Sequence, residues 1–501
     1  MKQRAGRTVE RAVAKPEFHL ITRGSSRILV LAAGCDNFRK TRRIGQDSAA
    51  ANVNSEAHKE GAVPRITFTL CLAAGLGLAA SQAARADVVT NWNAAAGRAA
   101  VAACISPALD PLHESRMYAM MHIAIHDALN AIDRRSRPYA FDAHVTTPTS
   151  ADAAVAATAR DVLVSAISQL PFPAECLTAA LTSVATDYAA ALAAVPSGPS
   201  KTAGIALGQA AAAEIVSRRS ADGSDTPLVV TDFEQGTEPG EYRFTPGFDF
   251  VFAPGWGRVT PFALRRSSQY RPNAPYHLSS KRYEEDFNEV KALGGDGVTT
   301  PTVRTSQQTE IGLFWLESSP LAWNRLARAV SEGQGLDVWE NARLFGLLNI
   351  AMADGYIGSW EAKFHYRFWR PVTAIRTADA DGNPDTEADP TWTPLQPTYP
   401  MPDHDSAHSV EGGAAAEVLK RVFGSDDIPF SACSLSLPAG STCADATPVL
   451  RSFTSFSAAA EENGLSRILV GIHFRNATEE GIQHGRKIGR RAVSMLLNRI
   501  Q

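Results

Sequence analysis

Lys363-Phe-His-Tyr-Arg-Phe-Trp-Arg370-Pro371 is the stretch that decides how this chain is interpreted. Two shorter stretches follow it, Asp405-Ser406-Ala407-His408 and Ser466-Arg467-Ile-Leu-Val-Gly-Ile-His473. Together they supply three cations, a hydroxyl and two imidazoles. Arginine forks match the oxygens of a phosphate-like anion two at a time, and lysine adds a compact charge. Imidazoles move protons or bond a central atom. The set therefore predicts an oxyanion site.

The spacing of the three stretches is more informative than their composition. They can be written Lys-x6-Arg-Pro, Ser-x-His and Ser-Arg-x5-His. With average residue usage, all three occur together by chance in roughly a few chains per thousand of this length. Ser-x-His alone carries no information, because about 0.7 copies are expected by chance.

In order and spacing the three stretches resemble the signature of one superfamily. It joins the vanadium-dependent haloperoxidases with the type 2 phosphatidic acid phosphatases and bacterial acid phosphatases. The resemblance runs through 91–93 and 122–133 and covers most of the chain after residue 87. The segments 369–376 and 471–475 are more similar to the bacterial haloperoxidase branch.

The resemblance implies an all-α protein of helical bundles that oxidises halide with hydrogen peroxide. Vanadate would be the cofactor, bonded to His473, and an organic acceptor could take the oxidised halogen. His408 would handle the peroxide proton, and Lys363 would polarise the peroxide. The groups expected to hold the vanadate oxygens are Lys363, Arg370, Ser406, the Ala407 amide and Arg467.

Three departures from the family pattern keep other functions open. The family usually has Pro-Ser-Gly-His where this chain has Asp405 and Ala407, and a carboxylate there is expected to weaken anion binding. Phosphatase-type members have an aspartate four residues after the last histidine, where this chain has Ala477. The alternatives are a phosphomonoesterase, with His473 phosphorylated by a phosphate ester and His408 protonating the leaving group, and a non-catalytic exported anion-binding protein.

Helix geometry limits how the site can assemble. Lys363 and Arg370, two turns apart, face one side only if helix persists between them, and Pro371 excludes regular helix beyond. Ser406 is expected to be a helix N-cap, with free amides of the first turn directed at an anion. Ser-Arg-x5-His converges only if its helix ends near Gly471.

Four further histidines could bind a metal or influence the site. His122 and His126, one turn apart and beside Asp127, could bind a metal, but no third ligand has recognisable spacing, and buried structural histidines are the more frequent case. His365 and His404 flank the signature stretches and could tune the site.

Composition limits the partners and the cellular location. The 501 residues are 45% hydrophobic and 20% charged, with a net charge of −3, as in an ordinary globular protein. This charge gives no case for a nucleic acid or an anionic membrane as partner. Residues 1–62 read as a disordered leader, with translation expected to begin near Val63. Residues 63–86 read as a secretory signal, with an apolar run too short for a stable membrane span and cleavage before Asp87. We expect an exported protein, periplasmic or secreted.

Four cysteines remain after the proposed leader, and an oxidising compartment would pair them. The local pair, Cys433 with Cys443, would leave Cys104 with Cys176. Four buried free thiols are the alternative if the chain is not exported.

Helical periodicity dominates the rest. We expect an N-terminal bundle over 87–221, an irregular aromatic connector over 222–300 that could roof the site, and a C-terminal bundle over 301–501 carrying it. The expected helices are 114–133, 152–170, 174–194, 201–219, 281–294, 304–333, 336–364, 406–422, 449–470 and 476–499.

Overall fold

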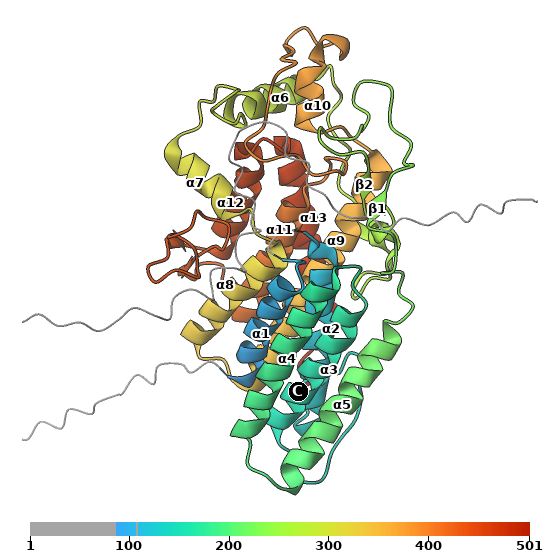
Figure 1. The fold of residues 1–501 in the computed structure, drawn as a ribbon, viewed down its shortest axis with the longest axis vertical. Coiled ribbons are helices and arrows are strands. Elements are labelled where there is room, and N and C mark those ends of the chain that lie inside the picture. The colour runs from blue at the N-terminus through green and yellow to red at the C-terminus, as the bar shows by residue number, and fades with distance from the viewer. Residues whose placement is uncertain (1–86, 107–108, 501) are drawn as a thin grey trace, which may run out of the picture. The chain divides into compact units, whose positions relative to one another are not determined.

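The computed structural model describes residues 87–106 and 109–500 (Figure 1). The leader over 1–62 and the signal peptide over 63–86 lie outside the described residues. The described part is all-α, as expected, with only short strands. Its helices are α1 (Val88–Ala102), α2 (Pro111–Ile132), α3 (Ala151–Ser168), α4 (Ala174–Ala194), α5 (Pro199–Arg218), α6 (Lys281–Leu293), α7 (Ser306–Phe314), α8 (Ser319–Gln334), α9 (Val338–Tyr366), α10 (Pro371–Arg376), α11 (Ala407–Phe423), α12 (Phe456–Leu469) and α13 (Arg475–Met495).

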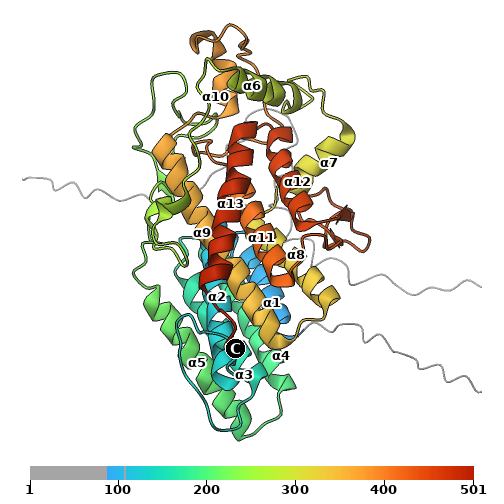
Figure 2. The ribbon, with the colours of Figure 1, turned by 180° about the vertical axis from the view of Figure 1, so that it is seen from behind.

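Helix α9 connects two groups of helices. It packs against α2, which belongs with α1 and α3 to α5, and against α11 and α13 on another side (Figures 1 and 2). Asp337 and Glu340 form a capping box at its start, and almost every residue from Asn341 to Lys363 is buried. A helix that is apolar on all sides belongs inside a protein. The division into bundles at 87–221 and 301–501 stays a prediction. Helix α9 lies within the second range and also packs against α2 of the first.

Glycines allow α11 and α13 to pack closely. A Cβ on Gly413 would lie 2.3 Å from the Ile482 carbonyl oxygen, and one on Gly485 would lie 1.9 Å from that of Val410. Any larger residue at either position would push the helices apart. The close packing also joins their first turns, where the Ser406 amide donates to the Ala477 carbonyl at 2.9 Å. It thereby fixes the position of the Ser-x-His stretch.

Three sequence-based expectations about helices were wrong. The helix expected over 304–333 is two helices, α7 and α8, because Ser318 caps a new helix that has Pro320 in its first turn. Pro371 does not end helical structure but begins α10, since proline is well suited to a first helical position. Part of 449–470 is strand β4 (Arg451–Phe453), which pairs with β3 (Phe430–Ala432).

Residues 222–280 are irregular, whereas α6 occupies the later part of the connector predicted over 222–300. They contain only the short antiparallel pair β1 (Val229–Val230) and β2 (Val251–Phe252), with two 3₁₀ turns. They lie against the segments that carry the site: the Trp369 amide donates to Gly240 at 2.9 Å, and the Phe252 amide donates to Pro400 at 2.7 Å. The connector therefore contacts the chain before the 377–403 loop and again near the end of that loop.

Both expected disulfides are present. Cys104 pairs with Cys176 across 72 residues of sequence, and Cys433 pairs with Cys443 across 10. The first ties α4 to the end of α1. Among the described residues, α4 is also the one helix long and apolar enough to cross a membrane. The expectation of no stable membrane span stays a prediction.

Candidate functional site

Lys363 lies in the last turn of α9 and is buried. The helix ends three residues later, where Arg367 takes a left-handed conformation (φ 49°) and the chain turns back. The Lys363 Nζ atom donates to the carbonyl oxygens of Pro402, Asp403 and Asp405 at 3.0, 3.0 and 2.5 Å. Burial, with help from the charge of Arg370, lowers its pKa to about 7. The three Nζ hydrogens thus hold the loop before α11. Lys363 can therefore act on an anion through its charge and has no further hydrogen to donate.

Arg370, the N-cap of α10, joins two of the other segments. Its Nε atom donates to the Met401 carbonyl at 2.7 Å, and Nη1 donates to the Ile472 carbonyl at 2.8 Å. Nη1 also lies 3.0 Å from Nε2 of His473. The guanidinium is buried, and burial lowers its pKa although the Asp403 carboxylate opposes this.

His473 reaches the same place because α12 stops early. The helix ends at Leu469, and Gly471 follows in a left-handed conformation (φ 82°), as the convergence of Ser-Arg-x5-His required. A Cβ there would lie 2.5 Å from the Gly294 carbonyl oxygen, so only glycine fits. Nδ1 of His473 lies 2.8 Å from Oδ1 of Asp403.

The Arg370 contact indicates the tautomer of His473. A guanidinium only donates, so Nε2 accepts with its lone pair and Nδ1 carries the hydrogen. Burial first, then the charge of Arg370, lowers the His473 pKa well below its ordinary value. A neutral imidazole whose second nitrogen faces a carboxylate resembles the usual arrangement of a ligating histidine, although neither Asp403 oxygen has a hydrogen-bond partner among the described residues.

Arg467, in the last turn of α12, is the third buried cation. Its Nη1 atom donates to the Trp315 carbonyl at 2.9 Å, while its buried Nε atom has no hydrogen-bond partner among the described residues. Burial lowers its pKa, and the charge of Arg370 lowers it further. Two buried guanidiniums that act on each other in this way favour a shared anion.

The Ser-x-His stretch forms the start of α11. Ser406 is the N-cap, as expected, but its Oγ atom is buried and has no hydrogen-bond partner among the described residues. Ala407 is the first helical residue, where amides lack intrahelical acceptors. Nε2 of His408 lies 3.3 Å from the Glu317 carbonyl oxygen, so Nε2 carries the hydrogen and Nδ1 is free to accept a proton. Burial, then the charge of Arg467, holds the His408 pKa well below its ordinary value.

Comparison with known proteins finds similarity to the vanadium haloperoxidases. Residues 343–501 match the family model of the VCPO second helical-bundle domain. The vanadium chloroperoxidase of Curvularia inaequalis is 26% identical over 285 residues, which are 44% of this chain and 45% of that protein. Over these residues the chain is similar to the vanadium haloperoxidases.

Solved structures show that the fold is shared. A bacterial vanadium-dependent iodoperoxidase superposes with a TM-score of 0.65 and 22% identity, covering 82% of this chain and 97% of that chain. A bacterial vanadium-dependent chloroperoxidase in its holo form has a TM-score of 0.62 and 16% identity, covering 82% of this chain and 97% of that chain. The chain thus spans less than half of the curated fungal relative but nearly all of these bacterial structures.

Asp405, where the superfamily usually has proline, does not face the cation cluster. Its carboxylate accepts from Ser359 Oγ at 2.7 Å and lies 2.8 Å from Nδ1 of His484, and all three side chains are buried. Burial raises its pKa, but His484, His404 and Lys363 together outweigh burial and bring the pKa to about 2. The expected conflict between this carboxylate and an anion is therefore absent, because the carboxylate is turned toward Ser359 and His484.

Asp403 is the functional residue that sequence reasoning missed. Phosphatase-type members have a carboxylate four residues after this histidine, where this chain has Ala477. In the structure the carboxylate beside His473 is instead that of Asp403, which comes from the loop before α11. Burial raises the Asp403 pKa to about 7, against the lowering effect of Arg370 and Lys363. Its place before the Ser-x-His stretch was visible, but nothing in its spacing pointed at His473.

These residues fit an oxyanion such as vanadate. Three buried cations, Lys363, Arg370 and Arg467, belong to this set, and the Asp403 carboxylate lies 3.8 Å from Arg370. Two buried polar atoms, Ser406 Oγ and Arg467 Nε, lack partners among the described residues. Unpaired buried polar atoms are costly unless a ligand or water completes them. The small cavity beside Asp403, of about 10 Å³, is lined by none of the three cations. A bond from His473 Nε2 to an anion requires Arg370 to leave that atom.

The remaining histidines have structural contacts. Nε2 of His122 lies 2.8 Å from Asn93 Nδ2, and His126 contacts Asp127 at 2.9 Å and Ser136 at 2.6 Å. In the part of the chain that the structure describes, no three His, Cys, Asp or Glu side chains gather to hold a metal ion.

His404 and His365, which flank the signature stretches, differ in how they lie relative to the candidate site. His404 is buried, contacts the Asn273 carbonyl at 2.8 Å and borders the small cavity beside Asp403. His365 instead lies 3.3 Å from Arg271 on a more exposed face. Of the two, His404 is the one placed to influence the site.

Proposed function

We propose that this protein is a vanadate-dependent haloperoxidase that oxidises halide with hydrogen peroxide. The observation that carries the proposal is the environment of His473, a neutral imidazole that contacts buried Arg370 and lies 2.8 Å from Asp403, with the charges of Lys363 and Arg467 acting on it. A charge cluster of this kind, preorganised away from water, stabilises an anion more strongly than the same groups in solvent.

The roles follow from the free atoms of each residue. His473 would bond the anion through Nε2, and Ser406 Oγ, Arg467 Nε and the Ala407 amide would donate to its oxygens. Lys363 and Arg370 would balance its charge. When bound, vanadate supplies the Lewis-acid activation of hydrogen peroxide toward halide.

His408 would move the proton. Its Nε2–H is directed at the Glu317 carbonyl, so its Nδ1 lone pair can take a proton from peroxide and return it to the product. Burial keeps the imidazole neutral near pH 7, which is the form that can act as a base. An organic acceptor for the oxidised halogen completes the proposal.

Reconstitution with vanadate tests the proposal. Purified protein loaded with vanadate and given peroxide should oxidise bromide or iodide, and His473→Ala should abolish this activity. The matched control is His144→Ala, which removes an exposed histidine and should leave activity unchanged. Absence of halide oxidation in correctly folded, vanadate-loaded protein would contradict the proposal.

A phosphomonoesterase is the second candidate, and Asp403 is the observation that favours it. It gives His473 the orienting carboxylate that the sequence lacked at Ala477. His473 Nε2 would then attack a phosphate ester while His408, once protonated, gives its proton to the leaving group. Phosphate-ester hydrolysis without halide oxidation would favour this function. Anion binding with neither activity would favour a non-catalytic binding protein.

Export to the periplasm or the cell exterior is part of the same proposal. The two disulfides support it, because such bonds persist in oxidising compartments. Sequencing the N-terminus of native protein tests it: a start near Asp87 is expected, and mature protein that keeps residues 1–62 would contradict it.

A further inference from the structure

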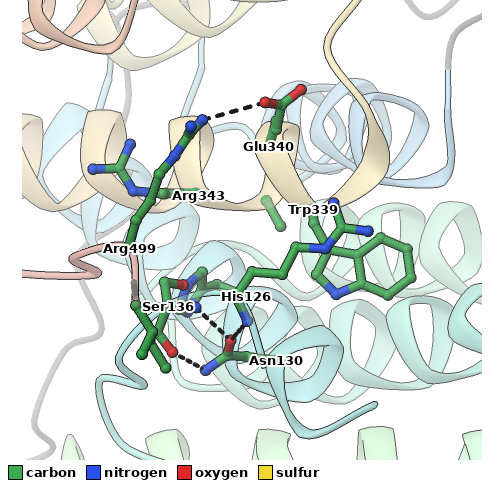
Figure 3. A pocket seen from close by; sticks show the side chains of 10 residues that line it. His126, Asn130, Ser136, Trp339, Glu340, Arg343 and Arg499 are labelled. Carbon is green, nitrogen blue, oxygen red and sulfur yellow. Dashed lines mark hydrogen bonds and ion pairs between the residues drawn. The ribbon is translucent and has the colours of Figure 1, made fainter. Parts of the chain in front are cut away.

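A second cavity, of about 180 Å³, lies beside the start of α9 (Figure 3). Its floor is α2, with His126 and Asn130, and one wall is the C-terminal segment. That wall is held by backbone pairing: the Ile500 amide donates to Arg135 at 3.0 Å, and the Arg137 amide donates to Asn498 at 2.9 Å. The cavity is therefore built from segments far apart in sequence.

Three arginines line this cavity, and two of them are paired. Arg135 donates to Asp133 at 2.7 Å and to Asp337 at 2.6 Å, and it stacks on Trp339 at 4.7 Å. Arg499 donates to Glu340 at 3.2 Å (Figure 3). The Arg499 side chain is 66% exposed, so the cavity can be reached from solvent.

Arg343 is the arginine of this cavity that has no carboxylate partner among the described residues. Its Nε atom donates to the Leu497 carbonyl at 2.8 Å, and among the described residues neither terminal nitrogen contacts a carboxylate or carbonyl. Burial lowers its pKa, and the nearby charge of Arg499 lowers it further. A partly buried guanidinium without a carboxylate partner is stabilised by an added anion.

We propose that this cavity binds a small organic monocarboxylate, with the terminal nitrogens of Arg343 forming a fork on its carboxylate group. Planar two-point pairing of this kind is the geometry in which guanidinium and carboxylate match best. Arg135 and Arg499 already have carboxylate partners, so the ligand charge is matched to Arg343, which has none among the described residues. Trp339, Ala342 and Ile500 give the cavity apolar surface for the body of the ligand.

The proposed site is separate from the oxyanion site. Arg343 and Lys363 lie on the same helix, 20 residues apart, and a rise of about 1.5 Å per residue places them about 30 Å from each other. The two sites can therefore be tested independently, and the carboxylate site does not depend on the haloperoxidase proposal.

Calorimetric titration of the full chain with benzoate tests the inference. Benzamide, which has the same shape without the charge, is the control ligand. The protein variants are Arg343→Gln, Arg343→Lys, His473→Ala and, as matched control, Arg98→Gln, which removes an arginine that is 57% exposed and lies outside the cavity lining. Circular dichroism checks that each variant is folded.

Benzoate should bind wild type, His473→Ala and Arg98→Gln with equal affinity, and benzamide should bind far more weakly. Arg343→Gln should weaken benzoate binding about 10-fold to 100-fold, the effect expected for losing charged hydrogen bonds, and Arg343→Lys should keep part of the affinity. No benzoate binding to wild type, unchanged binding to folded Arg343→Gln, or loss of binding in His473→Ala would each overturn the proposal.

Discussion

The substitution Asp405→Asn tests whether the carboxylate that stands in place of the family proline opposes anion binding or stabilises the fold. If the carboxylate faced the anion, removing its charge would tighten anion binding. In the structure it instead pairs with His484 and Ser359 inside the protein, while its backbone carbonyl holds Lys363. The substitution should therefore lower stability and should not improve anion binding.

The magnitude can be worked from the Asp405 pKa. Its fall from 3.8 to about 2 corresponds to roughly 2–3 kcal/mol that the ionised carboxylate adds to stability. Because the folded-state pKa is lowered, this contribution is present above about pH 4 and is lost as pH falls through about 2. Removing one partner of a buried pair costs about 3–5 kcal/mol, a similar size.

Thermal unfolding measures the effect. With an unfolding entropy of about 2.1 cal/mol/K per residue over roughly 400 folded residues, a loss of about 3 kcal/mol lowers Tm by about 3–4 °C. Asp142→Asn, at a site that is 66% exposed, is the matched control and should change stability by less than about 0.5 kcal/mol. Unchanged Tm together with tighter vanadate binding in Asp405→Asn would refute the reasoning.

Three further predictions concern the site and the scaffold. Sulfate, whose charge is constant over this range, should bind more tightly as pH falls from 8 to 6, because Lys363 gains and Asp403 loses a charge near pH 7; isothermal titration showing the opposite slope would contradict this. Ser406→Ala should leave Tm unchanged, since its Oγ atom has no protein partner, but should lower turnover about 10²-fold to 10³-fold in the halide assay. Replacing Cys104 and Cys176 by serine should cost about 4 kcal/mol for a 72-residue loop, and equal denaturation midpoints in urea would exclude this contribution.

The sequence alone was sufficient for what depends on local pattern. Helical periodicity gave the all-α class and most helix positions, and the glycine stop at 471 was visible because glycine alone adopts a left-handed backbone without strain. The spacing of Lys-x6-Arg-Pro, Ser-x-His and Ser-Arg-x5-His predicted the site residues and the resemblance to the superfamily. The cysteine count limited the disulfides to three pairings, of which the structure has the expected one.

Only the tertiary structure decided which way a side chain points and what it meets. Asp405 was expected to oppose an anion, but its carboxylate lies against α9 and α13, because side chains of successive loop residues point in different directions. Asp403 was overlooked, although it lies 2.8 Å from His473, which is 70 residues further along the chain. Pairings of this kind depend on how helices pack, and local sequence spacing carries no record of them.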